Sequence, residues 1–143
     1  MTYKPYEFLD HTSEIKILAR GETLEEAFDN MAKATFEVMT DTDKIKEAKT
    51  KHVTVKAQDE EKLLYDFIDE LIYLLDTEAF LLKRLENTTI KKNDELELTT
   101  KLIGDTQDDV NKYDVKSYIK SPTLSDLAIK KGKLYEITLV PDI

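Results

Sequence analysis

Carboxylates near the two ends of the chain are the best candidates for a chemical or metal-binding role, because of their type and their placement. Glu14 stands where a turn enters a strand-like run, and Asp142 and Ile143 finish the last strand-like run, with Ile143 supplying the terminal carboxylate. If these strands are neighbours, two or three hard oxygen donors converge, which suits Ca²⁺ or Mg²⁺ and poorly suits zinc. The alternative interpretation is that they are ordinary solvated charges.

Other familiar chemistries find little support in the residue types. The chain has no cysteine, which removes disulfides, thiolate zinc sites and cysteine nucleophiles together. Its three glycines are too scattered to build a phosphate-binding loop, and no serine has a histidine spaced to suggest a triad. His11 and His52, the two histidines, lie near strand boundaries, where a hydrogen-bonded structural role is the commoner one.

Length and charge limit the function further. A chain of 143 residues suits one compact domain, residues 1–143. Thirty acidic against 21 basic residues give a net charge of −9, so any RNA should be contacted mainly through a partner. The first ten residues lack the apolar region of a signal peptide, and no apolar run approaches the roughly 20 residues that span a bilayer. These features predict a cytoplasmic protein without membrane contact.

The elements that must position these carboxylates are readable from periodicity. Two strand-like runs, 6–10 and 14–20, precede Thr23 and Glu26, which have the spacing of a helix capping box. An apolar stripe with steps of three and four residues follows and predicts a helix. A second helix should open at Asp59, and its apolar residues cover more than half of its circumference, so it must be covered on more than one side.

The second half of the chain is rich in strand-like runs. An acidic stretch without periodicity, residues 104–114, predicts an exposed loop. With no regular alternation of strand and helix, the sequence predicts an α+β fold of mostly antiparallel sheets with two main helices packed on one side. The further predicted strands are 52–57, 79–91, 95–104, 115–120, 124–131 and 134–140.

A family resemblance runs through most of these elements. The run YEFLDHTSEIKILARGETLEEAFDNMAKATFEVMTD (residues 6–41) resembles the signature start of the archease family, YEFxxHTADxxIxAxGxTLEEAFxNAAxAxFxxMTD. FIDELIYLLDTEAF (residues 67–80) is similar to the family's WLNELLYLxDTExF, and VKS at 115–117 to its VKA. The final PDI matches the Asp-Ile that closes archeases.

The resemblance implies an archease-like fold and a role in tRNA splicing. Archeases are accessory proteins, not enzymes, and they activate the GTP-dependent tRNA-splicing RNA ligase by promoting its guanylylation and multiple turnover. They have also been described as chaperones or modulators of a tRNA cytosine-5 methyltransferase. Both partners are therefore expected for this chain.

The resemblance also implies a metal site. The family's ligands carry over onto Glu14, Asp142 and Ile143, with His11 as a structural neighbour. Glutamate replaces the family's aspartate at position 14, and the extra methylene moves the carboxylate by about 1.5 Å. Ca²⁺ tolerates such a change better than Mg²⁺, which demands near-octahedral geometry. Ca²⁺ is thus the expected ion, with Mg²⁺ or Mn²⁺ as alternatives.

Two further residues are candidates for contact with the partner. Lys116 matches the lysine of VKA, and as a point charge it suits a phosphate or an acidic group on the ligase. Taken alone it reads as a surface lysine, and the TYH that usually follows in the family is absent here. Glu70 lies on the polar stripe of the second helix and faces either the site or solvent.

Two other functions stay open on the sequence. A stand-alone metal-dependent phosphohydrolase would use Glu14, Asp142 and a bound ion to activate water. A general folding chaperone would expose an apolar patch of several hundred Å². The strongly charged helix faces argue against the chaperone.

Overall fold

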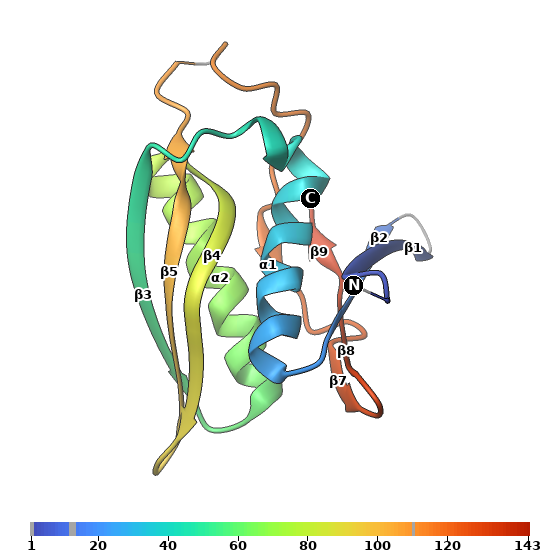
Figure 1. Cartoon of the computed structure of the whole chain (residues 1–143). Coiled ribbons are helices and arrows are strands. Elements are labelled where there is room, and N and C mark those ends of the chain that lie inside the picture. Colours follow the sequence, from blue (N-terminus) through green and yellow to red (C-terminus); the bar gives the residue numbers. More distant parts are fainter. Residues whose placement is uncertain (1, 12–13, 110) are drawn as a thin grey trace.

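Both helices lie between two antiparallel sheets in the computed structural model, which describes residues 2–11, 14–109 and 111–143 (Figure 1). Helix α1 (Leu24–Met39) and helix α2 (Glu60–Glu78) each pack against strands of both sheets. Each sheet therefore has helices on one side, and the α+β prediction is confirmed. The expectation that the second helix is covered on more than one side also holds.

The four-stranded sheet joins strands from the first and the last parts of the chain. Its order is β1-β2-β8-β7, with every neighbouring pair antiparallel. Ile17 on β2 pairs with Phe8 on one side and with Leu139 on the other, and Ile17 and Leu139 are fully buried against the helices. Its strands are β1 (Tyr6–His11), β2 (Glu14–Gly21), β7 (Ala128–Lys131) and β8 (Tyr135–Leu139).

The three-stranded sheet places β5 between β3 and β4. The β4/β5 pairing shifts register between Leu82 and Arg84, where β4 comes very close to Gly104. A Cβ added at Gly104 would lie 2.0 Å from the carbonyl oxygen of Leu81, so this position requires glycine. Its strands are β3 (Lys49–Ala57), β4 (Phe80–Lys92) and β5 (Leu96–Thr106).

Side-chain caps start both helices, as the sequence predicts. The hydroxyl of Thr23 accepts from the Glu26 amide at 3.1 Å, and the Glu26 carboxylate accepts from the amide of Glu22 at 3.3 Å. The carboxylate of Asp59 accepts from the Lys62 amide at 2.8 Å. No helix within the described ranges, α2 included, has the length and hydropathy to cross a membrane.

Apolar side chains from both helices form the core. The fully buried rings of Phe28 on α1 and Phe67 on α2 stack with their centroids 6.1 Å apart. Ala79 caps the carboxyl end of helix α2. Its φ of 54° is left-handed, and its amide donates to carbonyls of the last helical turn. A short 3₁₀ helix, η1 (Thr42–Lys44), follows α1.

The prediction of a strand over 115–120 is wrong. The amide of Lys116 donates to the carbonyl of Met39 at 2.8 Å, and the amide of Ile119 donates to the Met39 sulfur at 3.3 Å, so this segment covers the end of α1. The next residues form a short ladder in which β6 (Ser121–Pro122) pairs with β9 (Pro141–Asp142). The predicted strand 124–131 is likewise shorter, because β7 begins at Ala128.

Candidate metal site

The start of β2 and the strand β9 meet at one small cavity. Its volume is about 190 Å³, and it is lined by Glu14, Thr123, Pro141, Asp142 and Ile143. The structure thus brings together the three residues that the sequence singled out as metal ligands, although Glu14 lies 128 positions before Asp142 in the chain. Glu14 and Asp142 are both exposed, so their carboxylates are accessible from solvent.

Strand register explains why these residues meet. Ile17 on β2 lies opposite Leu139 on β8, and continuing the same antiparallel register along the chain places Glu14 opposite Asp142. Strand β9 indeed lies against β2. On the outer sides, Glu14 pairs with His11 of β1, and Asp142 pairs with Ser121 of β6. Two backbone pairs therefore meet at this corner of the molecule, His11 with Glu14 and Ser121 with Asp142.

The donor set is that of an open oxygen site. Within 2–11, 14–109 and 111–143, no three side chains from His, Asp and Glu gather in a way that could hold a metal ion. The side-chain carboxylates at this cavity are those of Glu14 and Asp142, and Ile143 lines the same cavity. Because Ca²⁺ takes six to eight oxygen ligands, the remaining positions would fall to water or to a partner. If water or a partner supplies the remaining ligands, these residues fit a hard divalent cation.

Part of the motif HTSE lies outside the described residues. Thr12 and Ser13 are not described, nor is the side chain of His11, so the role of His11 as a structural neighbour stays a prediction.

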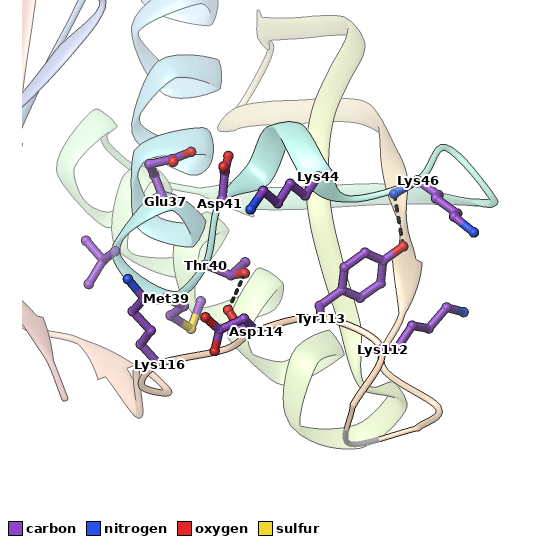
Figure 2. Close-up of a pocket in the computed structure, with 11 residues that line it drawn as sticks. Glu37, Met39, Thr40, Asp41, Lys44, Lys46, Lys112, Tyr113, Asp114 and Lys116 are labelled. Atoms are coloured by element: carbon purple, nitrogen blue, oxygen red, sulfur yellow. Dashed lines mark hydrogen bonds between the residues drawn. The ribbon is translucent and has the colours of Figure 1, made fainter.

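A larger cavity opens at the carboxyl end of α1 and is lined by Lys116 (Figure 2). Its volume is about 510 Å³. Charged residues of both signs surround it: Glu37, Asp41, Lys44, Lys46, Lys112, Asp114 and Lys116. Lysines and carboxylates thus line the same cavity at the negative end of the α1 helix dipole. Lys116 does not line the smaller cavity with Glu14 and Asp142.

The wall of this larger cavity depends on a buried carboxylate that the sequence did not single out. Asp105 is 1% exposed, accepts from the Tyr113 hydroxyl at 2.7 Å and from the Thr106 amide at 2.8 Å, and forms an ion pair with Lys112 at 3.0 Å. Burial opposes ionisation, but the hydrogen bonds from Tyr113 and Lys112 outweigh it and hold the pKa of Asp105 below its usual value. The signal that could have revealed it is a lone tyrosine within an acidic loop.

The segment that carries Lys116 is fixed at several points. The Tyr113 hydroxyl also accepts from the Lys46 amide at 3.0 Å, and the Thr40 hydroxyl donates to the carbonyl of Asp114 at 2.7 Å (Figure 2). The prediction of an exposed loop over 104–114 is therefore wrong for Asp105 and Tyr113, which are both buried. Glu70 lies half-buried on α2 and lines neither cavity.

Comparison with known proteins identifies the family. The model of the Archease protein family (MTH1598/TM1083) matches residues 6–143. Protein archease of Sulfurisphaera tokodaii is 38% identical over 139 residues, which cover 96% of this chain and 98% of that protein.

Two solved structures share the fold. The solution structure of Methanobacterium thermoautotrophicum protein 1598 superposes with a TM-score of 0.81 at 31% identity and covers 97% of this chain and 99% of that one. The crystal structure of a Thermotoga maritima archease, described as a possible chaperone, matches with a TM-score of 0.59 at 18% identity, covers 100% and 98%, and shows the fold alone. From the family match and the relative at 38% identity, the chain belongs to the archease family.

Proposed function

We propose that the protein is a non-enzymatic accessory factor that binds a divalent metal and activates the GTP-dependent tRNA-splicing RNA ligase, promoting its guanylylation and multiple turnover. The observation that carries this proposal is the shared cavity of Glu14 and Asp142, which places two exposed carboxylates from distant segments side by side. Membership of the archease family supports the choice of partner.

The proposed ligands are the carboxylates of Glu14 and Asp142 and the terminal carboxylate of Ile143. Ca²⁺ is the ion that best accepts the longer side chain of Glu14, and Mg²⁺ or Mn²⁺ are alternatives. When bound, such an ion would supply positive charge to a partner's active site that handles phosphate groups. The chain's own contribution is to hold two carboxylates on adjoining strands while leaving one side of the site open.

Lys116 and Glu70 are proposed as contacts to the ligase. The backbone of Lys116 is fixed by its bond to Met39, so its ammonium group extends from a defined point on the rim of the larger cavity (Figure 2). The net charge of −9 favours RNA contact through the partner, in the cytoplasm, and not through this chain. A tRNA cytosine-5 methyltransferase is a second proposed partner, on the family resemblance alone.

General chaperone activity finds less support in the surface. Among the described residues, five large apolar side chains are exposed, and they come from five different segments: Phe8, Tyr73, Tyr118, Leu124 and Ile143. This distribution does not favour the broad apolar face that unfolded clients require. A stand-alone phosphohydrolase would have to hydrolyse a phosphate ester without any partner.

Multiple-turnover ligation of split tRNA halves tests the proposal. The cognate ligase, GTP and a divalent metal are combined with and without this protein, and the number of products per ligase is counted. Asp142→Asn removes the proposed ligand, and Asp94→Asn is the matched control because Asp94 is an exposed aspartate in the turn between β4 and β5. We expect wild type and Asp94→Asn to raise a single turnover to many, and Asp142→Asn to lose the effect.

The other outcomes separate two parts of the proposal. No stimulation by the wild-type protein would overturn the role as ligase activator. Equal stimulation by wild type and Asp142→Asn would keep the activator role and overturn the metal site.

A further inference from the structure

The strand that carries Asp142 is held by an unusual two-residue ladder. Ser121 pairs with Asp142, and Pro122 pairs with Pro141. Proline has no amide hydrogen, so neither member of the second pair can donate a ladder hydrogen bond. Other donors must therefore fix the backbone at this position.

Two hydrogen bonds flank the proline pair. On one side, the amide of Lys120 donates to the carbonyl of Asp142 at 2.7 Å. On the other side, the hydroxyl of Thr123 donates to the carbonyl of Val140, also at 2.7 Å. The Thr123 side chain thus takes the place of a backbone donor and anchors the residue that leads into β9.

The hydrogen bond from Thr123 to Val140 lies between buried residues and the cavity of the proposed metal site. Val140 is fully buried and Pro141 is buried, whereas Asp142 is exposed. A carbonyl beside these buried residues that lost its donor would carry a desolvation cost, and the backbone would shift to find another partner. Thr123 itself lines the cavity together with Glu14 and Asp142, so such a shift would act directly on the site.

We infer that Thr123 is a positioning residue of the metal site. Its hydroxyl fixes the carbonyl of Val140, which sets the backbone of β9 and presents the Asp142 carboxylate opposite Glu14. The inference rests on the metal site of the proposed function. Groups that orient metal ligands without touching the ion typically contribute about 10–100-fold to affinity, because donors that must first be brought together bind more weakly.

Calorimetric titration of the full chain with Ca²⁺ tests the inference. Thr123→Val removes the hydroxyl and keeps the shape, Thr123→Ser restores the hydroxyl, and Thr123→Ala is a second variant without it. Thr54→Val is the matched control, because Thr54 is an exposed threonine on β3 in the other sheet. Circular dichroism before each titration confirms that every variant is folded.

We expect the dissociation constant for Ca²⁺ to rise about 10-fold in Thr123→Val and in Thr123→Ala. It should stay near the wild-type value in Thr123→Ser and Thr54→Val. Rescue by serine separates the hydroxyl bond from a general loss of packing.

Asp142→Asn, titrated alongside, separates failure of the inference from failure of the site. If Asp142→Asn abolishes binding while Thr123→Val binds like wild type, the metal site stands and the role of Thr123 is overturned. A rise of similar size in Thr54→Val would overturn it as well. If the wild-type protein takes up neither Ca²⁺ nor, in parallel titrations, Mg²⁺ or Mn²⁺, the site itself and the inference built on it are both overturned.

Discussion

The helical core and the corner formed by β2, β6 and β9 are built in opposite ways. The core has fully buried aromatic rings from two helices that stack on each other between two sheets. The corner has the exposed carboxylates of Glu14 and Asp142, and the strand that carries Asp142 is held by a ladder of two residue pairs, one of which cannot donate a backbone bond. We therefore expect most of the stability to come from the core, and the proposed metal chemistry to lie in a region that contributes little to it. Variants should therefore separate the two properties.

The largest loss of stability should come from the core. Phe67→Ala removes a fully buried ring that stacks on Phe28, and we expect the free energy of unfolding to fall by about 3–5 kcal/mol. Urea unfolding followed by circular dichroism measures it. Tyr73→Ala on the same helix is the control, because this ring is 58% exposed and its loss should change little. Similar losses of unfolding free energy in both variants would contradict the assignment of stability to the buried core.

A pH-dependent effect should come from Asp29, a core-facing carboxyl on α1. Burial raises its pKa from 3.8 to about 6, and the hydrogen bond from Thr88 compensates only in part. Because the folded protein holds the proton more tightly than the unfolded chain, wild-type stability should fall as pH rises from about 4 through 6. Asp29→Asn should lack this fall and be more stable at pH 7 by up to about 2–3 kcal/mol.

Urea unfolding of wild type and Asp29→Asn at pH 4 and at pH 7 gives the difference. A constant difference between the two pH values would contradict the raised pKa of Asp29.

Close approach of two strands predicts a smaller loss at Gly104. The added methyl of Gly104→Ala would meet the Leu81 carbonyl, and the forced shift of β4 should cost about 1–3 kcal/mol in unfolding free energy. Gly132→Ala is the matched control, because the nearest atom to its added Cβ would be 3.9 Å away. Thermal unfolding distinguishes them, and an unchanged midpoint for Gly104→Ala would contradict the close packing of β4 on β5.

The smallest effect on stability should come from the corner. Asp142 is exposed, and its recorded bond to Lys120 uses the backbone carbonyl and not the carboxylate. Without divalent ions, Asp142→Asn should therefore unfold within about 0.5 kcal/mol of wild type. Chemical denaturation in the presence of a chelator measures this free energy of unfolding. A loss in Asp142→Asn as large as that in Phe67→Ala would show that the corner stabilises the fold as much as the core does.

Local patterns predicted the starts of both helices well. The capping box at Thr23 and the acidic cap at Asp59 each start a helix through a contact within three residues. These predictions succeed because each depends on near neighbours. The approach of Glu14 to Asp142 was predicted only on the condition that their strands are neighbours, which no local pattern establishes.

Contacts between distant segments were not predictable in the same way. Residues 115–120 have a strand-like composition, but the amide of Ile119 meets the sulfur of Met39, 80 positions away, at the end of α1. Asp105 lies in an acidic stretch that reads as solvated, yet Tyr113 and Lys112 bury it. No local periodicity encodes such partners, because the bonds form only after α1 and β5 have been packed together.

Formation of the covalent ligase–guanylate adduct from labelled GTP tests the proposed function most directly. The rate is measured for the cognate ligase alone, with wild-type protein, and with Asp142→Asn at equal folded concentration. The proposed metal-bearing activator predicts faster adduct formation with wild type and no acceleration with Asp142→Asn. Equal acceleration by both proteins, or none by wild type, would contradict it.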